Sequence, residues 1–297
     1  MTMRVVLMAT LPLVLSAQED PFFLDLSDAP TVTRIAVGAY DQAFSDQGGH
    51  WKGWTLEGTI YPGLAGPWVL SATGFDRPEG KGVLFSGGKY FLVGQASSVF
   101  LALGGGTNED FLPRLRADLE VRFGLGSGWK LDLAGALNRY SDNQDVRLVQ
   151  AGPAYVGKGW SLSVRGQQVS YDAGAPSDTG AIMNVRIGNS DFGMWHQLRL
   201  AAGRGILETS AAGARMSTAS SALAGFGGRF GRGGTRASGA SGSTTSIGDS
   251  LPQERLVSLS GHWPLTGRFA LQAEAAWGER VSANRFWGGS LQVVVTF

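Results

Sequence analysis

Charged residues alternate with apolar residues along short segments of this chain, and their spacing is the first place to look for chemistry. Between residues 114 and 123, Arg116, Asp118, Glu120 and Arg122 fall on one face of an extended strand, because side chains there alternate with a period of two. Two carboxylates at this spacing lie about 7 Å apart, which is compatible with acid/base hydrolysis. Since an arginine stands on either side, a charge-balanced ladder is the favoured interpretation.

The histidines do not indicate a catalytic or metal site. His50, His196 and His262 lie on unrelated segments and lack the spacing of metal ligands. A barrel lipase or deacylase would need a serine or an acid beside a histidine near the outer rim, and the sequence marks no such set. His196 shares the parity of Leu198 and Leu200, which suits an interfacial position better than a base. We therefore expect no catalytic residue, no metal, no cofactor and no enzymatic activity.

The elements that would position these charges are strands of an outer-membrane barrel, and the last segment of the chain shows this best. In residues 287–297, small or polar residues share one face, and the other face carries Leu291, Val293, Val295 and Phe297. A terminal aromatic residue on an apolar stripe is typical of the closing strand of a bacterial outer-membrane barrel, whose apolar face meets lipid. We predict that these four residues form the membrane-insertion signal, which contacts the barrel-assembly machinery.

The beginning of the chain and its composition agree with export to that membrane. Residues 1–17 have the basic start, the apolar run and the small residues of a cleaved signal peptide, with an N-terminal anchor helix as the alternative. The absence of cysteine excludes a lipoprotein anchor and a disulfide framework. Glycine is 45 of 297 residues, as many tight turns would require. A net charge of +1 argues against nucleic acid as a partner. The predicted location is the outer membrane of a Gram-negative bacterium.

An aromatic residue follows a short glycine- or serine-containing turn about every 30 residues, which is the length of two tilted strands of about 9–11 residues plus their connections. Each period is therefore one hairpin. The aromatic residues would form a girdle at one level of the membrane: Trp68, Phe100, Trp129, Trp160 and Phe192. The connections at the other ends of the strands are longer and more polar, as extracellular loops are. The N-terminus and the C-terminus would therefore both be periplasmic, and the strand number would be even.

The sequence predicts an all-β, antiparallel, up-and-down transmembrane β-barrel of about 14 strands, with 12 as the alternative. The strands are expected near residues 32–44, 51–61, 67–76, 83–93, 98–107, 114–124, 128–140, 145–156, 160–171, 179–188, 193–203, 254–263, 267–277 and 286–297. Residues 18–31 would be a periplasmic linker and residues 32–297 the barrel. Residues 204–252 are rich in Ala, Gly, Ser and Thr and predict a long flexible extracellular loop. The strand at 145–156 is ambiguous, because Arg147 and Gln150 have opposite parity.

Charge on the lipid-facing side of a strand would cost about 2–4 kcal/mol per residue at mid-bilayer. We therefore assign the charged faces to the lumen. The predicted lumen-lining residues are Glu57, Arg116, Asp118, Glu120, Arg122, Lys130, Asp132, Arg165, Arg186, Arg199 and Glu274. A barrel of 12–14 strands lies between the side-chain-filled size near 8 strands and the open size near 16–18. Its lumen could be a narrow pore or could be closed by its own side chains.

Several short motifs also carry a family resemblance: Phe111-Leu-Pro-Arg114, Arg139-Tyr140, Ala151-Gly-Pro-Ala-Tyr155, Gly159-Trp160 and Asn184-Val-Arg-Ile187. Through them and the terminal Phe297, residues 89–206 and 253–297 resemble the YaiO-like family of outer-membrane β-barrel proteins. The resemblance implies an outer-membrane barrel with a link to surface polysaccharide or envelope biogenesis, and it carries over no functional residue. The 204–252 segment looks longer than the family pattern.

These observations predict a narrow pore, or an export or envelope-biogenesis barrel, with a charged lumen. The alternative is a non-conducting structural or binding barrel that acts through its extracellular loops. The expected partners are outer-membrane lipid, lipopolysaccharide and the assembly machinery. The sequence does not set the oligomeric state.

Overall fold

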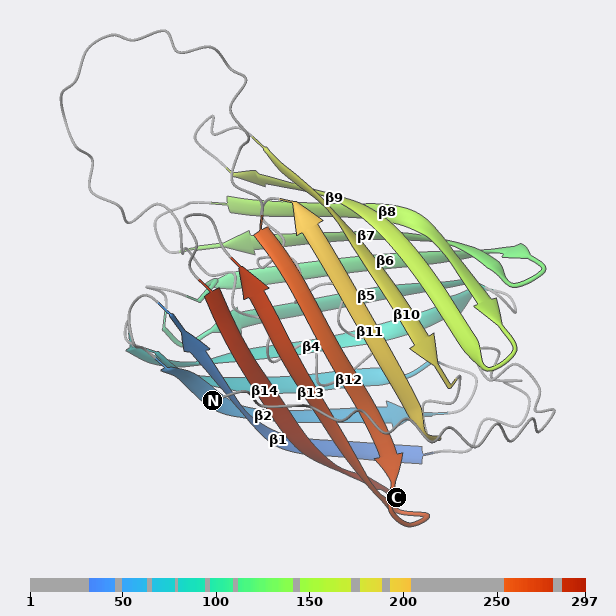
Figure 1. Ribbon diagram of the computed structural model, residues 1–297, viewed down its shortest axis with the longest axis horizontal. Helices are drawn as coiled ribbons and strands as arrows, with labels where there is room; N and C mark the ends of the chain where they lie inside the picture. The colour runs from blue at the N-terminus through green and yellow to red at the C-terminus, as the bar shows by residue number, and fades with distance from the viewer. Residues whose placement is uncertain are drawn as a thin grey trace, which may run out of the picture.

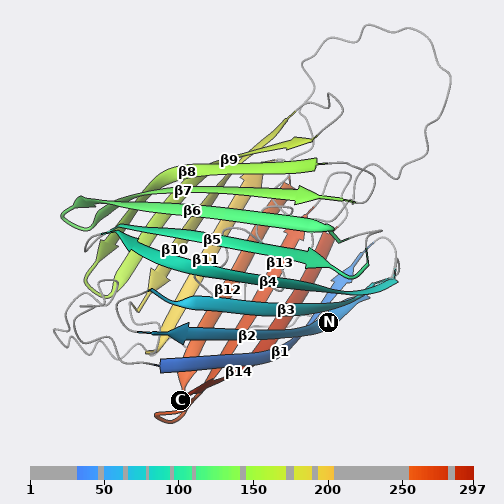
Figure 2. The same ribbon diagram turned by 180° about the vertical axis from the view of Figure 1, so that it is seen from behind.

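The chain forms a closed antiparallel barrel (Figures 1 and 2). The computed structural model describes residues 32–45, 50–62, 66–77, 80–93, 97–108, 112–140, 145–171, 177–188, 193–203, 254–279 and 285–297. Within them the strands are β1 (Val32–Phe44), β2 (His50–Tyr61), β3 (Trp68–Arg77), β4 (Gly80–Val93), β5 (Ser97–Gly106), β6 (Leu115–Gly126), β7 (Trp129–Arg139), β8 (Asp145–Gly157), β9 (Trp160–Tyr171), β10 (Asp178–Ile187), β11 (Trp195–Gly203), β12 (Glu254–Pro264), β13 (Phe269–Glu279) and β14 (Arg285–Thr296).

Each strand pairs with its neighbours in sequence, and β14 pairs with β1 to close the barrel. The predicted fold class and the strand number of 14 are confirmed, and every predicted strand overlaps an observed one. Among the described residues, no helix is long and apolar enough to cross a membrane. The predicted signal peptide, the linker 18–31 and the loop 204–252 lie outside the described residues and stay predictions.

The strands form because large apolar residues alternate with polar or small ones, and closure places the two sets on opposite faces of the wall. The outer face exposes large apolar side chains throughout, which is the reverse of a soluble protein and is typical of a barrel in lipid. Representative exposed residues are Val37, Leu70, Phe85, Leu103, Val149, Leu259 and Leu291. The ambiguous strand is resolved as well: Gln150 lies inside and is buried, whereas Arg147 lies outside.

The two ends of the barrel differ in their connections. β6–β7 and β8–β9 are joined by two residues each, and Gly126, Ser127 and Gly128 have positive φ angles of 90°, 49° and 81° at the first of these turns. Such left-handed conformations are those of tight hairpin turns. The connections at the opposite end have five residues or more, except that only residues 78–79 separate β3 from β4, whereas residues 62–67 and 188–194 at the short-turn end are as long as several of them. In outer-membrane barrels the shorter turns face the periplasm, so the periplasmic position of this end stays a prediction.

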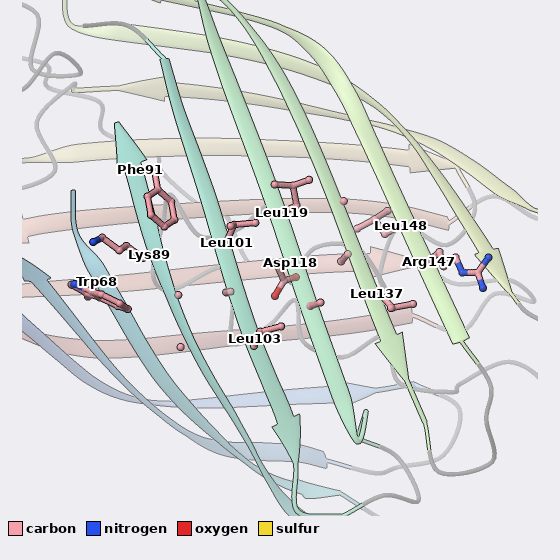
Figure 3. A pocket seen from close by; sticks show the side chains of 16 residues that line it. Trp68, Lys89, Phe91, Leu101, Leu103, Asp118, Leu119, Leu137, Arg147 and Leu148 are labelled. Atoms are coloured by element: carbon pink, nitrogen blue, oxygen red, sulfur yellow. The ribbon is translucent and has the colours of Figure 1, made fainter. Parts of the chain in front are cut away.

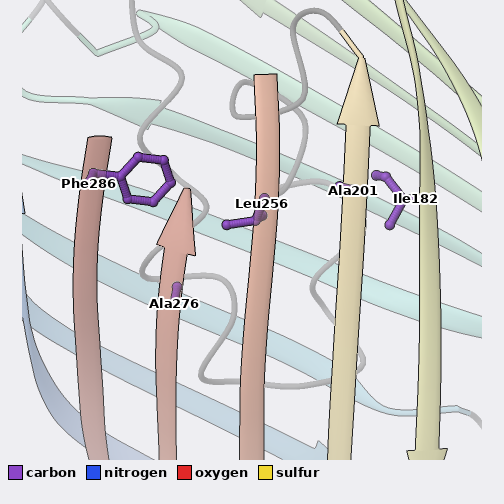
Figure 4. Close-up of a cluster of buried hydrophobic side chains, with 5 residues drawn as sticks. All are labelled: Ile182, Ala201, Leu256, Ala276 and Phe286. Carbon is purple, nitrogen blue, oxygen red and sulfur yellow. The ribbon is translucent and has the colours of Figure 1, made fainter. Parts of the chain in front are cut away.

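The inner face also carries apolar patches. One cluster spans β10–β14 near the ends that adjoin the longer connections (Figure 4): Ile182, Ala201, Leu256, Ala276 and Phe286. Smaller clusters join Ala136 to Leu148 and Val169, and Ala36 to Ala270 and Val294. The charged part of the inner face is therefore bordered by packed side chains.

Candidate functional site: the charged inner wall

The structure places all of the predicted lumen-lining residues on the inner face. Glu57 is half-buried and points to the same side of β2 as the buried Thr55 and Thr59. The others are buried: Arg116, Asp118, Glu120, Arg122, Lys130, Asp132, Arg165, Arg186, Arg199 and Glu274. Their position agrees with the sequence analysis, while their lining of a conducting path stays a prediction.

Four of these side chains form a connected set that we call the inner-wall network: Glu120, Arg122, Asp132 and Arg165. Asp132 on β7 is its centre, since it accepts hydrogen bonds from Arg122 Nε at 2.8 Å and from Arg165 Nη2 at 2.6 Å. Arg122 Nη2 also donates to Glu120 Oε1 at 3.4 Å, and Arg165 Nη2 lies 3.9 Å from the same oxygen. The Asp132 side chain is only 2% exposed, so this balanced network has little contact with solvent.

Arg165 on β9 reaches Asp132 on β7 across the intervening strand, and a glycine of that strand lies between them. Gly152 on β8 is the Cα partner of Asp132. A side chain at this position would overlap the carbonyl oxygen of Val164 and would lie 2.7 Å from the Cα of Arg165. The missing side chain therefore allows the backbone of β9 to lie close to β8 at Arg165.

Asp118 is held separately by Arg116 on the same strand. Arg116 Nε and Nη2 donate to the two carboxylate oxygens, each at 2.9 Å, in a bidentate arrangement. Asp118 and Glu120 are thus both engaged with arginines, as a ladder requires, and neither is presented as an acid or a base. Among the described residues, no His, Cys, Asp and Glu side chains form a group of three that could hold a metal ion.

A second side-chain contact that spans a glycine lies at the seam between the first and last strands. Gln292 on β14 donates from Nε2 to Thr55 Oγ1 on β2 at 3.0 Å, although β1 lies between them. The β1 residue in register with both is Gly38, where a side chain would overlap Cγ of Gln292. All of these contacts join residues on one strand or on strands at most three apart around the wall. They therefore run along the wall and not across the barrel.

Arg199 on β11 has more unused donors than the network arginines, of which Arg165 has only its Nε unused. The Nε and Nη2 atoms of Arg199 are buried and make no hydrogen bond with the described residues. Its charged neighbours are Glu274 and Arg165. A buried guanidinium with unused donors is costly on its own and favours the approach of an anion.

Sequence reasoning missed a stack of three side chains on β10–β12, at the short-turn end. The His262 ring stacks on Trp195 with centroids 6.0 Å apart and an interplanar angle of 8°. The Arg186 guanidinium covers Trp195 at 4.6 Å, and His262 Nδ1 lies 2.8 Å from the carbonyl oxygen of Gly193. The shared parity of Trp195 and Arg199 in the sequence could have placed this tryptophan inside.

The aromatic girdle stays a prediction, and the structure places its residues differently. Trp68, Trp129 and Trp160 are exposed on the outer face, and each is the first residue of its strand. Phe100 was predicted wrongly: it is 1% exposed and packs inside against Tyr90, with ring centroids 4.4 Å apart. It is the fourth residue of β5, not the first, so its side chain points to the opposite face. Phe192 lies outside the described residues.

The predicted insertion signal lies on the outer face of β14 and at its end. Leu291, Val293 and Phe297 are exposed, and Val295 is half-buried on the same face. Phe297 also pairs with Thr33 through its backbone, N to O at 2.8 Å, which joins the end of the chain to β1. Recognition by the assembly machinery stays a prediction.

Comparison with known families settles the affiliation of the chain. The model of the YaiO membrane β-barrel domain matches residues 32–205, which is more than half of the 297 residues. The chain belongs to this family. The match begins at β1, well before residue 89, where the sequence resemblance began, and it does not include the final three strands.

Solved structures with the same fold include two outer-membrane proteins of different function. The CymD monoaromatic hydrocarbon channel is 6% identical, with 94% of this chain and 92% of that chain covered and a TM-score of 0.54. A bacterial polysaccharide outer membrane secretin is 8% identical, with 91% of this chain and 100% of that chain covered and a TM-score of 0.51. At these identities the similarity of the YaiO-family barrel to them shows the fold alone. A comparison with curated proteins finds no sequence match.

Proposed function

We propose that this YaiO-family barrel lies in the outer membrane of a Gram-negative bacterium and acts as a narrow pore with a charged lumen. The observation that carries the proposal is the direction of the inner ion pairs. Arg122, Asp132 and Arg165 are linked around the wall, so the network can line a path along the barrel axis without bridging it. The size of the barrel, between the filled and the open classes, supports a narrow path.

The charges on the path suggest a solute with negative charge. Arg199 offers buried donors that none of the described residues uses, and a ring of side chains of one sign selects ions in other pores. A link to surface polysaccharide is the further expectation from the family resemblance, and anionic polymers or their fragments fit such a wall.

Single-channel recording tests the pore. The refolded protein in a planar bilayer should conduct, and Arg199→Gln should shift its ion preference towards cations, as measured by the reversal potential in a salt gradient. The matched control is Arg147→Gln, which removes a cation from the outer face and should leave the preference unchanged. A silent barrel that is correctly folded, as judged by its heat-modifiable gel mobility, would contradict the pore.

A non-conducting barrel is the second candidate, and one specific observation favours it. The side chains of the inner-wall network are no more than 10% exposed, whereas side chains that line a wide aqueous channel are expected to be exposed to solvent. In this case the barrel would act through its extracellular loops, and the recording described above would be silent.

The inner carboxylates do not support an enzymatic activity, and we propose none, because Asp118 and Glu120 are both engaged in ion pairs. The exposed apolar face supports contact with membrane lipid and lipopolysaccharide, and the outward stripe of β14 supports recognition of this strand by the barrel-assembly machinery.

A further inference from the structure

The outer face of the barrel contains a hollow of about 740 Å³ that runs across β3–β8 (Figure 3). Its sides are outward-facing leucines, among them Leu101, Leu119 and Leu137. Asp118 and Leu148 border it through their backbone, since their side chains are buried on the inner face.

Small residues create this hollow. Gly87 on β4, Ala117 on β6 and Gly135 on β7 occupy outward positions between the leucines. Because these positions carry little or no side chain, the surface of the wall sinks below the level of its neighbours. The volume lies within the roughly 300–1,000 Å³ of typical ligand pockets.

A lysine stands at one end of the hollow, close to the periplasmic turns. Lys89 is in register with Trp68, the first residue of β3, and its Nζ lies 4.8 Å from the centroid of that ring and 5.4 Å from the Phe91 ring. In the part of the chain that the structure describes, Lys89 makes no ion pair with a carboxylate. A cation on the lipid-facing side is tolerated near the membrane interface, where tryptophan is also enriched.

The opposite end carries an arginine whose charge is already compensated. Arg147 lies near the start of β8, and its Nη2 is 3.7 Å from Asp145 Oδ2. Lys89 is therefore the cation at this hollow that can accept an external anion, and it lies at the level of the periplasmic leaflet.

From this arrangement we propose that the hollow binds one phospholipid of the periplasmic leaflet. An acyl chain lies over Gly87, Ala117 and Gly135, and the anionic phosphate contacts Lys89. Lipid tails are as apolar as leucine, so the gain comes from close packing in the hollow and from the charge contact. The proposal is independent of whether the lumen conducts.

A filling variant with a matched control tests the site. Gly135→Leu should occupy the hollow without strain, because among the described residues, chain neighbours aside, the nearest atom to a Cβ at this position is the Leu148 carbonyl oxygen at 3.6 Å. The control is Gly166→Leu on β9, which is also outward, has only the Ala151 carbonyl oxygen nearby at 3.9 Å, and lies outside the hollow. Lys89→Gln tests the contact with the phosphate.

Native mass spectrometry of the full-length protein, released from vesicles of phosphatidylglycerol and phosphatidylethanolamine, measures the lipid that remains bound. The wild-type protein and Gly166→Leu should each retain one phospholipid, with phosphatidylglycerol preferred. Gly135→Leu should lose this lipid while it keeps its heat-modifiable gel mobility. Lys89→Gln should lose the preference for phosphatidylglycerol.

Two results would overturn the proposal. Equal retention by Gly135→Leu and Gly166→Leu would mean that the hollow is not the site. The second test adds lipopolysaccharide to the vesicles. If the protein then retained lipopolysaccharide in place of phospholipid, and this retention depended on Arg147 and not on Lys89, the hollow would belong to the outer leaflet.

Discussion

Replacing Asp132 with asparagine is the most direct probe of the inner wall. The change keeps the shape of the side chain and removes the charge that Arg122 and Arg165 share at 2.8 and 2.6 Å. The amide oxygen can still accept one hydrogen bond, but the amide nitrogen would then face the second guanidinium. Within the inner-wall network, Glu120 would be the remaining carboxylate opposite two buried arginines.

The expected loss follows from burial. The Asp132 side chain is 2% exposed, and those of Arg122 and Arg165 are 10% and 8% exposed, so the pairs lie where solvent screening is weak. Removal of one partner of a buried ion pair costs about 3–5 kcal/mol, because the remaining charge stays buried and uncompensated. We expect Asp132→Asn to lower the free energy of unfolding by this amount.

Equilibrium urea unfolding of the barrel in phospholipid vesicles measures the effect, with the fluorescence of the nine tryptophans and gel mobility as two probes. Asp76→Asn is the control. Asp76 pairs with Lys81 at 3.1 Å, but the lysine side chain is 79% exposed, so this change should cost no more than about 1 kcal/mol. The double variant Asp132→Asn/Arg165→Gln should cost less than the sum of the two single changes.

A loss for Asp132→Asn within about 0.5 kcal/mol of the Asp76→Asn loss would refute the reasoning, since surface pairs contribute only about 0–1 kcal/mol. The network would then behave as a solvated one, and the low exposure of its side chains would not describe their environment. That result would also remove the observation that favours a non-conducting barrel.

Two other predictions concern single positions. Gly152→Ala should destabilise the barrel by about 1–3 kcal/mol through overpacking against β9, whereas Gly166→Ala should be nearly neutral because it meets nothing closer than 3.9 Å; urea unfolding compares the two, and equal losses would contradict the close approach at Gly152. Deletion of Phe297 should reduce insertion into the outer membrane more than deletion within any extracellular loop, since it removes both an outward aromatic ring and the backbone pairing with Thr33; a normal yield of folded protein in membrane fractions would count against this.

The fold was predictable because lipid imposes one rule on every strand. Apolar residues at alternate positions had to face outward, so the faces of β6, β7 and β14 followed from parity alone. The error at Phe100 came from a different rule, that an aromatic residue after a turn belongs to the girdle. Parity within β5 gives the right answer, because Leu101 and Leu103 occupy the outward positions and Phe100 alternates with them.

The connections inside the wall could not be read from the sequence. Arg165 and Asp132 are 33 positions apart, and their contact depends on the register of β7, β8 and β9 together. Gly152 looks like any other turn-forming or flexible residue until the structure shows how closely the backbone of β9 approaches it. The hollow on the outer face likewise depends on small residues from separate strands that register brings together, and a single strand carries no sign of it.

The hydrogen bond from Gln292 to Thr55 has a consequence for assembly. It links the last strand to the second one, so it can form only when β14 has already paired with β1. A slip of one residue at this seam would turn Gln292 towards lipid and break the bond, because alternate residues face opposite sides. Correct closure of the barrel therefore depends on a side-chain contact as well as on backbone pairing. A barrel that closed in the wrong register would carry an unpaired glutamine side chain facing the membrane lipid.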